Sequence, residues 1–340
     1  MSKPLGRFHK LIFAINTVAA VLLLVSFITP FVNPERFPLF SALSLAVSPL
    51  LVINALFALY WLVRLNRRVW LSALLLIVGF FEFNGFIKFS SSDSETAANE
   101  LSVLSFNVQL FEAYNDNPDN QAAQKMNQLV DKQRPDVLFI QEYYKQDSLA
   151  LSAYPYSFVH FKEDYTMGHA IFSKYPLINT GAFDFTKTSN NTLYADLLVG
   201  NDTIRLYNLH LQSYRIAPSV SEIQSRGTEF LTKRLKKAFR IQQRQLDTIL
   251  KHKNQTEHPV IIAGDLNNTA FSYVYRELQR DFVDAFAAKG SGLGATFKVE
   301  FYPIRIDYIF VDPQLRVLNY NTCKAGFSDH KPITATVGWD

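Results

Sequence analysis

The first 90 residues consist of long uncharged apolar runs separated by short charged segments. Residues 11–32 and 39–63 contain no Asp, Glu, Lys or Arg. A helix of about 20 apolar residues is long enough to cross the hydrocarbon core of a bilayer. Both runs therefore predict transmembrane helices.

A third apolar run extends from Val69 to Ile87 and contains one carboxylate, Glu82. A charge at the centre of a membrane helix costs about 2.5–3.5 kcal/mol. Glu82 lies well past the middle, where it can face a neighbouring helix or the far interface. We expect a third span at about 69–88, so that residues 1–90 form a membrane anchor. The alternative is a helix that lies in the membrane interface.

After a polar, acidic linker at 91–100, the pattern becomes that of a soluble α/β protein. Short β-branched and aromatic runs predict strands at 101–108, 136–142, 203–211, 259–265 and 305–311. Helical periodicity precedes two of these strands, at 122–133 and 222–252. We expect one domain over residues 101–340.

The formal charge of +4, from 34 basic and 30 acidic residues, is unevenly distributed. Residues 1–90 carry 8 of the basic and 2 of the acidic residues, which leaves the predicted domain at −2. The basic excess therefore belongs to the membrane flanks and gives no evidence for a nucleic-acid-binding surface. The lone Cys323 cannot form an internal disulfide.

The basic residues of the anchor predict its orientation. They flank the first two spans on one side: Lys3, Arg7, Lys10, Arg64, Arg67 and Arg68. Only Arg36 lies between the spans, so the positive-inside rule places the N-terminus in the cytoplasm. Three crossings put the domain outside the cytoplasm (the periplasm in a bacterium), whereas two put it inside. A cleaved signal peptide competes for the first run, but that run is too long and a second span follows.

Polar residues fall at the ends of the predicted strands. Asn107, Glu142, His210 and Asp265 each lie at or near such an end, where side chains from neighbouring strands share one rim. Asp265 begins the sequence Asp-Leu-Asn-Asn after a buried run, so it can hold an attacking water while Asn267 holds a phosphate oxygen. An ordinary turn is the alternative, because Asp and Asn favour turns.

Two further segments carry acid–base groups near the C-terminus. Asp307 lies inside the apolar strand Ile-Asp-Tyr-Ile-Phe, where a carboxylate needs a partner. We expect that partner to be His330 of the Ser-Asp-His-Lys-Pro segment; the alternative is a structural contact with Arg305 or a backbone amide. Glu142 is a candidate ligand for a hard cation such as Mg²⁺, with Asn107 orienting it.

The order of these motifs resembles the endonuclease/exonuclease/phosphatase superfamily. The series is F-N, Q-E, G-H-A-I-F-S-K-Y-P, N-L-H, G-D-L-N, R-I-D-Y-I-F and S-D-H-K-P, over residues 101–340. The resemblance implies a four-layer α/β sandwich, with two packed β-sheets flanked by helices. It also implies metal-dependent hydrolysis of phosphoester bonds.

The resemblance assigns roles at the matching positions. Glu142 would bind Mg²⁺ or Mn²⁺ with support from Asn107, and Asp329 would lie beside the metal. Asp265 would orient or deprotonate the attacking water, and Asn267 would contact the phosphate.

Two histidines complete the implied site. His330, held by Asp307, would stabilise charge on the phosphoryl oxygens, and His210 would contact the phosphate or assist the leaving group. His169, where the family often has an apolar residue, is not assigned a catalytic role.

The substrate is left open by these motifs. The segment from Tyr214 to Arg244 holds eight Lys/Arg. It is either an amphipathic helix packed on the sheet or a basic lid that approaches phospholipid headgroups or a polyanionic substrate. We expect Arg240 in it to bind substrate. A nuclease-like phosphodiesterase, a phospholipid or inositol-phosphate phosphoesterase of the sphingomyelinase kind, and a non-catalytic membrane-tethered module remain as functions, and the sequence does not specify an oligomeric state.

Overall fold

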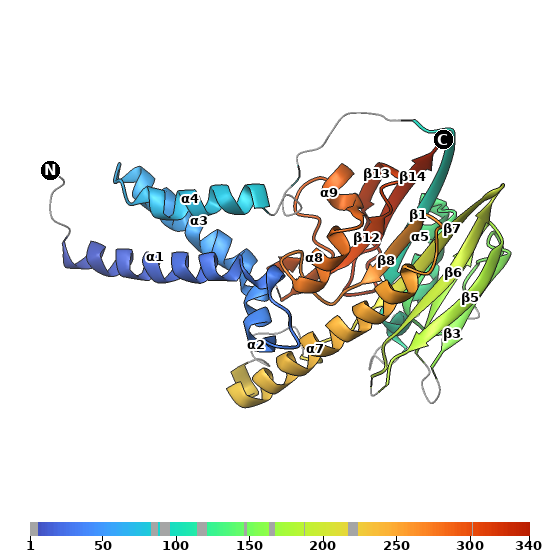
Figure 1. Ribbon diagram of the computed structural model, residues 1–340, viewed down its shortest axis with the longest axis horizontal. Coiled ribbons are helices and arrows are strands. Elements are labelled where there is room, and N and C mark those ends of the chain that lie inside the picture. The colour runs from blue at the N-terminus through green and yellow to red at the C-terminus, as the bar shows by residue number, and fades with distance from the viewer. Residues whose placement is uncertain are drawn as a thin grey trace.

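Apolar helices at the N-terminus extend away from a two-sheet α/β domain in the computed structural model of this chain (Figure 1). The structure describes residues 6–82, 88, 96–113, 121–145, 148–162, 167–186, 188–216, 224–300 and 302–340. Residues 91–95 of the predicted linker therefore lie outside the described residues.

Three helices form the N-terminal part: α1 (Arg7–Ser26), α3 (Val47–Val63) and α4 (Val69–Glu82). Short turns η1 (Thr29–Phe31), α2 (Pro38–Ser41) and η2 (Ala42–Ala46) connect α1 to α3. Two helical stretches, Arg7–Phe31 and Pro38–Val63, are long and apolar enough to cross a membrane.

The expectation of three full-length spans is corrected by α4. Its 14 described residues extend about 21 Å at 1.5 Å per residue, short of the roughly 30 Å hydrocarbon core. The described helix ends at Glu82, the carboxylate that interrupts the run, and residues 83–87 lie outside the described part. Among the described residues, two candidate spans therefore stand where three were expected.

A buried polar network ties α4 to α1 and α3. Asn16 donates to Ser72 Oγ at 2.7 Å, and Ser72 Oγ donates to Asn54 Oδ1 at 2.9 Å. The Trp61 indole donates to Asn16 Oδ1 at 3.0 Å. Gly79 of α4 brings the backbone close to Phe27 and Leu51, where a Cβ would approach to 3.0 and 3.3 Å. Small and amide-bearing residues of this kind hold helices together where surrounding lipid is as apolar as the side chains.

The domain contains two six-stranded sheets. The first has the order β13-β14-β1-β2-β4-β3 and is formed by β1 (Asn99–Asn107), β2 (Val137–Tyr143), β3 (Tyr156–Phe161), β4 (Gly168–Ser173), β13 (Arg316–Thr322) and β14 (Ile333–Trp339). Within it, β1 and β2 pair in parallel.

The second sheet has the order β5-β6-β7-β8-β12-β9. Its strands are β5 (Leu177–Asp184), β6 (Asn191–Val199), β7 (Asp202–His210), β8 (Val260–Asp265), β9 (Val283–Asp284) and β12 (Asp307–Val311). Here β7 and β8 pair in parallel. A separate hairpin is formed by β10 (Phe297–Val299) and β11 (Tyr302–Ile304).

Helices cover the outer faces of both sheets. The inner faces meet in one apolar core that includes Val103, Phe139, Leu206 and Ile261. On the outer face of the first sheet lies α5 (Ala122–Gln133), and on that of the second lie α7 (Thr228–Lys253) and α8 (Tyr273–Gln279). The short α9 (Ala285–Lys289) packs near β12 and β13. These layers form the expected α/β sandwich.

The segment between α1 and α3 is packed against the domain. Phe271, on the loop after β8, is buried in a cluster with Leu23, Phe27 and Val47. Its carbonyl accepts a hydrogen bond from Thr29 Oγ1 at 3.3 Å. The domain therefore lies at the end of the helical bundle where α1 finishes and α3 begins (Figure 1).

Candidate active site

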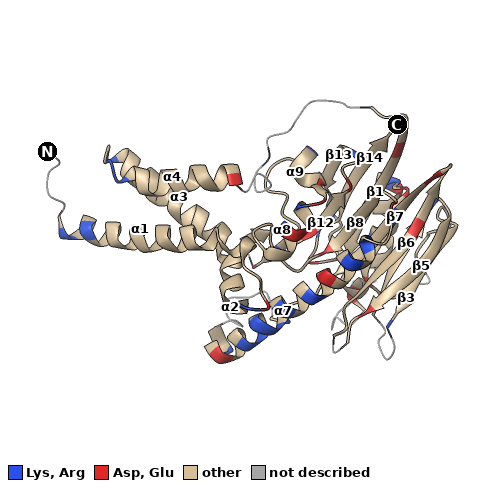
Figure 2. Ribbon diagram, viewed as in Figure 1, with Lys and Arg blue, Asp and Glu red and all other residues tan. Residues whose placement is uncertain are grey.

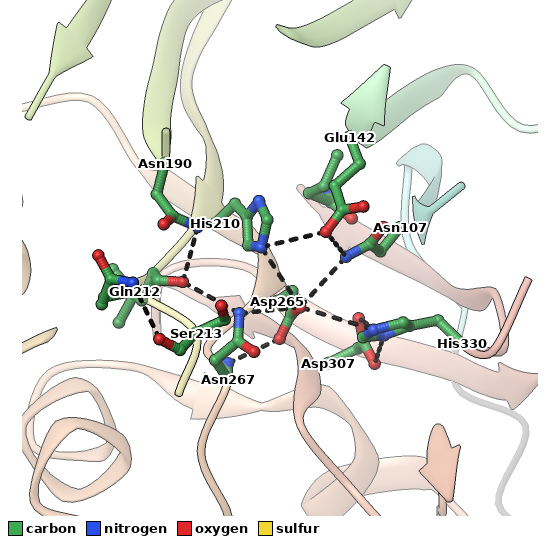
Figure 3. Close-up of polar contacts among 12 residues, drawn as sticks. Asn107, Glu142, Asn190, His210, Gln212, Ser213, Asp265, Asn267, Asp307 and His330 are labelled. Carbon is green, nitrogen blue, oxygen red and sulfur yellow. Dashed lines mark hydrogen bonds and ion pairs between the residues drawn. The ribbon is translucent and has the colours of Figure 1, made fainter. Parts of the chain in front are cut away.

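Neighbouring strands of the second sheet bring three ionisable residues into one row. The parallel pairing of β7 and β8 sets His210 opposite Asp265, and the antiparallel pairing of β12 and β8 sets Asp307 opposite Asp265. In the first sheet, Asn107 ends β1 and Glu142 lies one residue from the end of β2. The two sheets meet at this rim, so these side chains converge (Figure 3).

Asn107 bridges two carboxylates that come from different sheets. Its Nδ2 donates to Glu142 Oε1 and to Asp265 Oδ2, both at 3.2 Å. The Asn107 carbonyl in turn accepts from Ser328 Oγ at 2.8 Å, which fixes the loop that carries His330. Burial raises the pKa of Glu142, although the Asn107 hydrogen bond opposes this.

The loop after β8 folds back on the Asp265 carboxylate. The Asn267 backbone N–H donates to Asp265 Oδ1 at 2.6 Å, and the Asn267 side-chain amide donates to Asp265 Oδ2 at 3.1 Å. Gly264 allows β8 to lie close to β7 just before Asp265, because it has φ +140° and a Cβ there would lie 2.0 Å from the Leu209 carbonyl oxygen. Asp265 is 1% exposed, and this burial raises its pKa.

The pairing of Asp307 with His330 that the sequence suggested is present. His330 Nδ1 lies 2.9 Å from Asp307 Oδ2, and its Nε2 lies 3.7 Å from Asp265 Oδ2. Burial alone would lower the pKa of His330, but the charges of Asp307 and Asp265 outweigh burial and raise it to about 10. The imidazole is therefore a cation at neutral pH, with Nε2 as a hydrogen-bond donor.

His210 approaches the same carboxylates from the opposite side. Its Nε2 lies 3.6 Å from Glu142 Oε1 and 3.7 Å from Asp265 Oδ2. Burial and the nearby positive charge of His330 lower the pKa of His210 to about 3. The site thus holds one neutral and one protonated imidazole on either side of Asp265.

A buried amide pair beneath the site was not anticipated from the sequence. Gln141 Nε2 donates to Asn208 Oδ1 at 2.7 Å across the two sheets, and Asn208 donates to the carbonyls of Ile140 and Ala170. Gln141 precedes Glu142, and Asn208 lies two residues before His210. A signal was available, because an amide inside an apolar strand requires a buried partner.

Arg240 does not join the cluster, and Asp329 lies at its exposed edge. Arg240, expected to bind substrate, lies on α7, where its Nε donates to the Glu35 carbonyl at 3.3 Å. Asp329 is exposed, and its backbone N–H contacts Gln109 Oε1 at 3.4 Å. Arg240 was predicted to bind substrate because the sequence does not reveal the contact between α7 and the segment that carries Glu35.

The donor set of the site fits a hard divalent cation. Ligand atoms of Asp265, Asp307 and His330 lie within 4.8 Å of one another. Since Asp307 already occupies His330 Nδ1, the Glu142 carboxylate that Asn107 orients is the better donor. Burial raises the pKa of the Glu142 carboxyl, and a bound cation would favour its charged form. Oxygen donors of this kind are those that Mg²⁺ prefers.

Comparison with known proteins gives matches to families and to solved structures. The model of the "Endonuclease/Exonuclease/phosphatase family" matches residues 104–330, and that of a "Domain of unknown function (DUF8431)" matches residues 9–86. No curated protein matches this chain.

Solved structures share the fold at low sequence identity. An endonuclease/exonuclease/phosphatase from Bacteroides vulgatus is 18% identical with a TM-score of 0.54, over 71% of this chain and 100% of that one. Truncated Caenorhabditis elegans TDP2 is 20% identical with a TM-score of 0.52, over 72% and 100%. The human Nocturnin catalytic domain with bound sulfate is 18% identical with a TM-score of 0.51, over 72% and 97%.

The match between the family model and residues 104–330 spans every residue of the cluster, from Asn107 to His330. The solved structures share this fold over about 71% of the chain. This chain belongs to the endonuclease/exonuclease/phosphatase family.

Proposed function

We propose that this chain is a membrane-anchored phosphodiesterase that hydrolyses phosphoester bonds with the help of a divalent cation. The observation that carries the proposal is the placement of a neutral His210 and a protonated His330 on opposite sides of Asp265. A phosphoryl group bound beside these residues would accept a hydrogen bond from His330, and the buried Asp265 would act as the base. Phosphoryl transfer depends mainly on such positioning and charge neutralisation.

Each side chain has a defined task in this proposal. Asp265 accepts the proton of the attacking water, because burial raises the pKa of its carboxyl toward the working range of a general base. His330 donates a hydrogen bond from Nε2 to a phosphoryl oxygen, and Asp307 holds the ring in position. The Asn267 amide lies beside the same oxygens, and neutral His210 faces the leaving-group side.

The cation would be held by Glu142, with Asn107 orienting that carboxylate and Asp329 close by. When bound, such an ion neutralises charge on the phosphoryl oxygens and lowers the pKa of a coordinated water. The cluster holds more carboxylates than cationic side chains, which supports the assignment of Mg²⁺ or Mn²⁺.

The fold also suggests which side of the membrane the domain occupies. The α1–α3 connection contacts the domain, whereas the basic ends of α1 and of the α3–α4 turn lie at the far end of the bundle (Figure 2). If α1 and α3 cross and the chain returns along α4 to the side of the α1–α3 connection, the positive-inside rule puts that far end in the cytoplasm and the domain outside it. Without that return the domain would lie in the cytoplasm. With the return, cysteines placed at Lys10 and Lys324 of a Cys323→Ser chain should react with an impermeant thiol reagent from opposite sides; labelling from one side contradicts this topology.

The enzymatic part is tested with the full chain in detergent. The panel contains bis-p-nitrophenyl phosphate, plasmid DNA, RNA, sphingomyelin and phosphoinositides, each with Mg²⁺, Mn²⁺ or EDTA. We expect turnover that EDTA abolishes and that His330→Ala lowers about 10²–10³-fold, the usual cost of removing one transition-state donor.

The matched control is His160→Ala, which removes an imidazole paired with Asp184 at 2.8 Å, outside the site. It should retain activity. A folded chain that binds Mg²⁺ and hydrolyses none of the panel would contradict the proposal in favour of a non-catalytic module.

A further inference from the structure

The helix α7 has two halves with different surroundings. From Ala238 onward it packs on the second sheet, with Phe239, Leu246 and Ile249 buried. None of residues 228–237 is buried. Figure 1 shows this N-terminal half reaching beyond the sheets to the side of α2. The packed-helix interpretation therefore holds for the C-terminal half only.

One face of α7 is turned toward the anchor. Residues 233, 237, 240 and 244 follow a helical repeat of three or four and lie on a single stripe. All four are Lys or Arg and all are exposed. Arg240 and Arg244 of this stripe contact Glu35 in the α1–α3 connection. Lys233 and Lys237 continue the same stripe toward the N-terminus of α7, past that contact.

Apolar side chains accompany these cations. In α2 and just before it, Phe37 is 61% exposed and Leu39 is 44% exposed. The guanidinium carbons of Arg226 and Arg234 lie 5.4 and 5.2 Å from the centre of the Phe230 ring of α7. Cationic groups beside exposed aromatic and aliphatic side chains are the pattern of segments that lie at a bilayer surface.

The basic surface continues to the edge of the active site. A small cavity of about 20 Å³ lies between α7 and the loop that follows β7. Its lining includes Arg215, Arg234 and Lys237, together with Gln212 and Ser213. Gln212 and Ser213 appear in the close-up of the site (Figure 3). Gln242, further along α7, donates to the Asn267 carbonyl at 3.2 Å.

We propose that the N-terminal half of α7 lies on the surface of the bilayer that α1 and α3 cross and binds anionic phospholipid headgroups. Three observations support it: the direction of the basic stripe, the exposed apolar side chains of α2, and the contact of α7 with the anchor. Each Lys or Arg near an anionic surface raises the binding constant about fivefold, which corresponds to about 1 kcal/mol. The consequence is that the active site is held facing the membrane. The inference rests on the membrane anchoring proposed above, but not on catalysis.

The test uses the full chain in nanodiscs of phosphatidylcholine alone or of phosphatidylcholine mixed with phosphatidylglycerol. An environment-sensitive nitrobenzoxadiazole dye is attached at Glu229→Cys, and at Thr248→Cys as the control, each with Cys323→Ser. We expect emission at position 229 to rise about twofold or more in the anionic discs and to fall back in high salt, because salt screens exposed charges. Emission at position 248 should not change.

Charge variants decide the cause of the rise. Lys233→Gln with Lys237→Gln should abolish it, whereas the matched pair Lys251→Gln with Lys253→Gln, at the other end of the helix, should leave it intact. The inference is overturned if emission from position 229 is equal in both kinds of disc. It is also overturned if the two double variants reduce the rise in emission equally. Hydrolysis of bis-p-nitrophenyl phosphate is measured in the same discs, so a failure of lipid binding and a failure of the proposed catalysis are separate outcomes.

Discussion

His210 and His330 are both buried, but His210 is neutral and His330 is protonated at neutral pH. The difference comes from their neighbours, because His330 has Asp307 at 2.9 Å whereas the Nδ1 of His210 has no hydrogen-bond partner among the described residues. A third imidazole, His169, lies with its ring centroid 5.3 Å from that of His210. Burial and His210 lower the pKa of His169 well below its ordinary value.

This arrangement predicts acid sensitivity of the fold. Below the ordinary histidine pKa of about 6.5, the unfolded chain binds a proton at His169 that the folded chain does not, so stability falls as the pH is lowered. The variant His169→Leu lacks this pH-dependent loss of stability. Between pH 7 and 5.5 we expect its free energy of unfolding to fall by roughly 1 kcal/mol less than that of the wild type. Chemical unfolding of the full chain at both pH values measures this, with the exposed His258→Leu as control; identical pH dependence of both variants would contradict it.

At the scale of elements, the site is held together by contacts between sheets. The Gln141–Asn208 pair joins β2 to β7 directly below Glu142 and His210. Because Asn208 also donates to two carbonyls, its removal leaves several buried groups unsatisfied.

Asn208→Leu should therefore destabilise the protein by about 2–3 kcal/mol. It should also lower kcat about tenfold or more, since small displacements of reacting groups are costly. Thermal unfolding and steady-state kinetics measure the two effects. Asn319→Leu on the exposed face of β13 is the matched control, and an Asn208→Leu enzyme as stable and active as that control would rule out the role of the pair.

The elements were predictable where one residue pattern dominated. The helix at 122–133 has the predicted bounds, and the five predicted strands appear as β1, β2, β7, β8 and β12. Strand β5 was missed because its residues are only partly buried and because Asn, Gly and Asp, which are depleted in strands, occur in its sequence. The Asp307–His330 contact could be inferred because a carboxylate in an apolar strand needs a partner. The position of Arg240 could not, because it depends on packing between distant parts of the chain.

At the scale of the whole molecule, anchor and domain share an apolar contact. Phe271 is 1% exposed because Leu23, Phe27 and Val47 cover it. A second contact joins Lys88, after α4, to Gly292 through backbone hydrogen bonds of 3.0 and 2.8 Å. Both contacts hold the domain against the helices.

Phe271→Ala should loosen this docking at a cost of about 3–5 kcal/mol. We expect trypsin to cleave after Lys88 at least about fivefold faster in the variant, because local opening exposes the paired backbone. Phe282→Ala removes a phenylalanine from the core of the domain (3% exposed) and should lower Tm without accelerating this cleavage. Equal cleavage rates in the two variants would show that Phe271 does not hold the anchor in place.

If α1 and α3 cross a bilayer as proposed, the packing of the α1–α3 connection on the domain also determines how the domain would meet a phosphoester. A domain held against its own membrane helices explores a smaller volume than one on a long linker. A phosphoester in the same bilayer reaches it by lateral diffusion, at an effective concentration set by surface density. Diluting the surrounding solution would leave hydrolysis of such a substrate unchanged and slow that of a dissolved one in proportion.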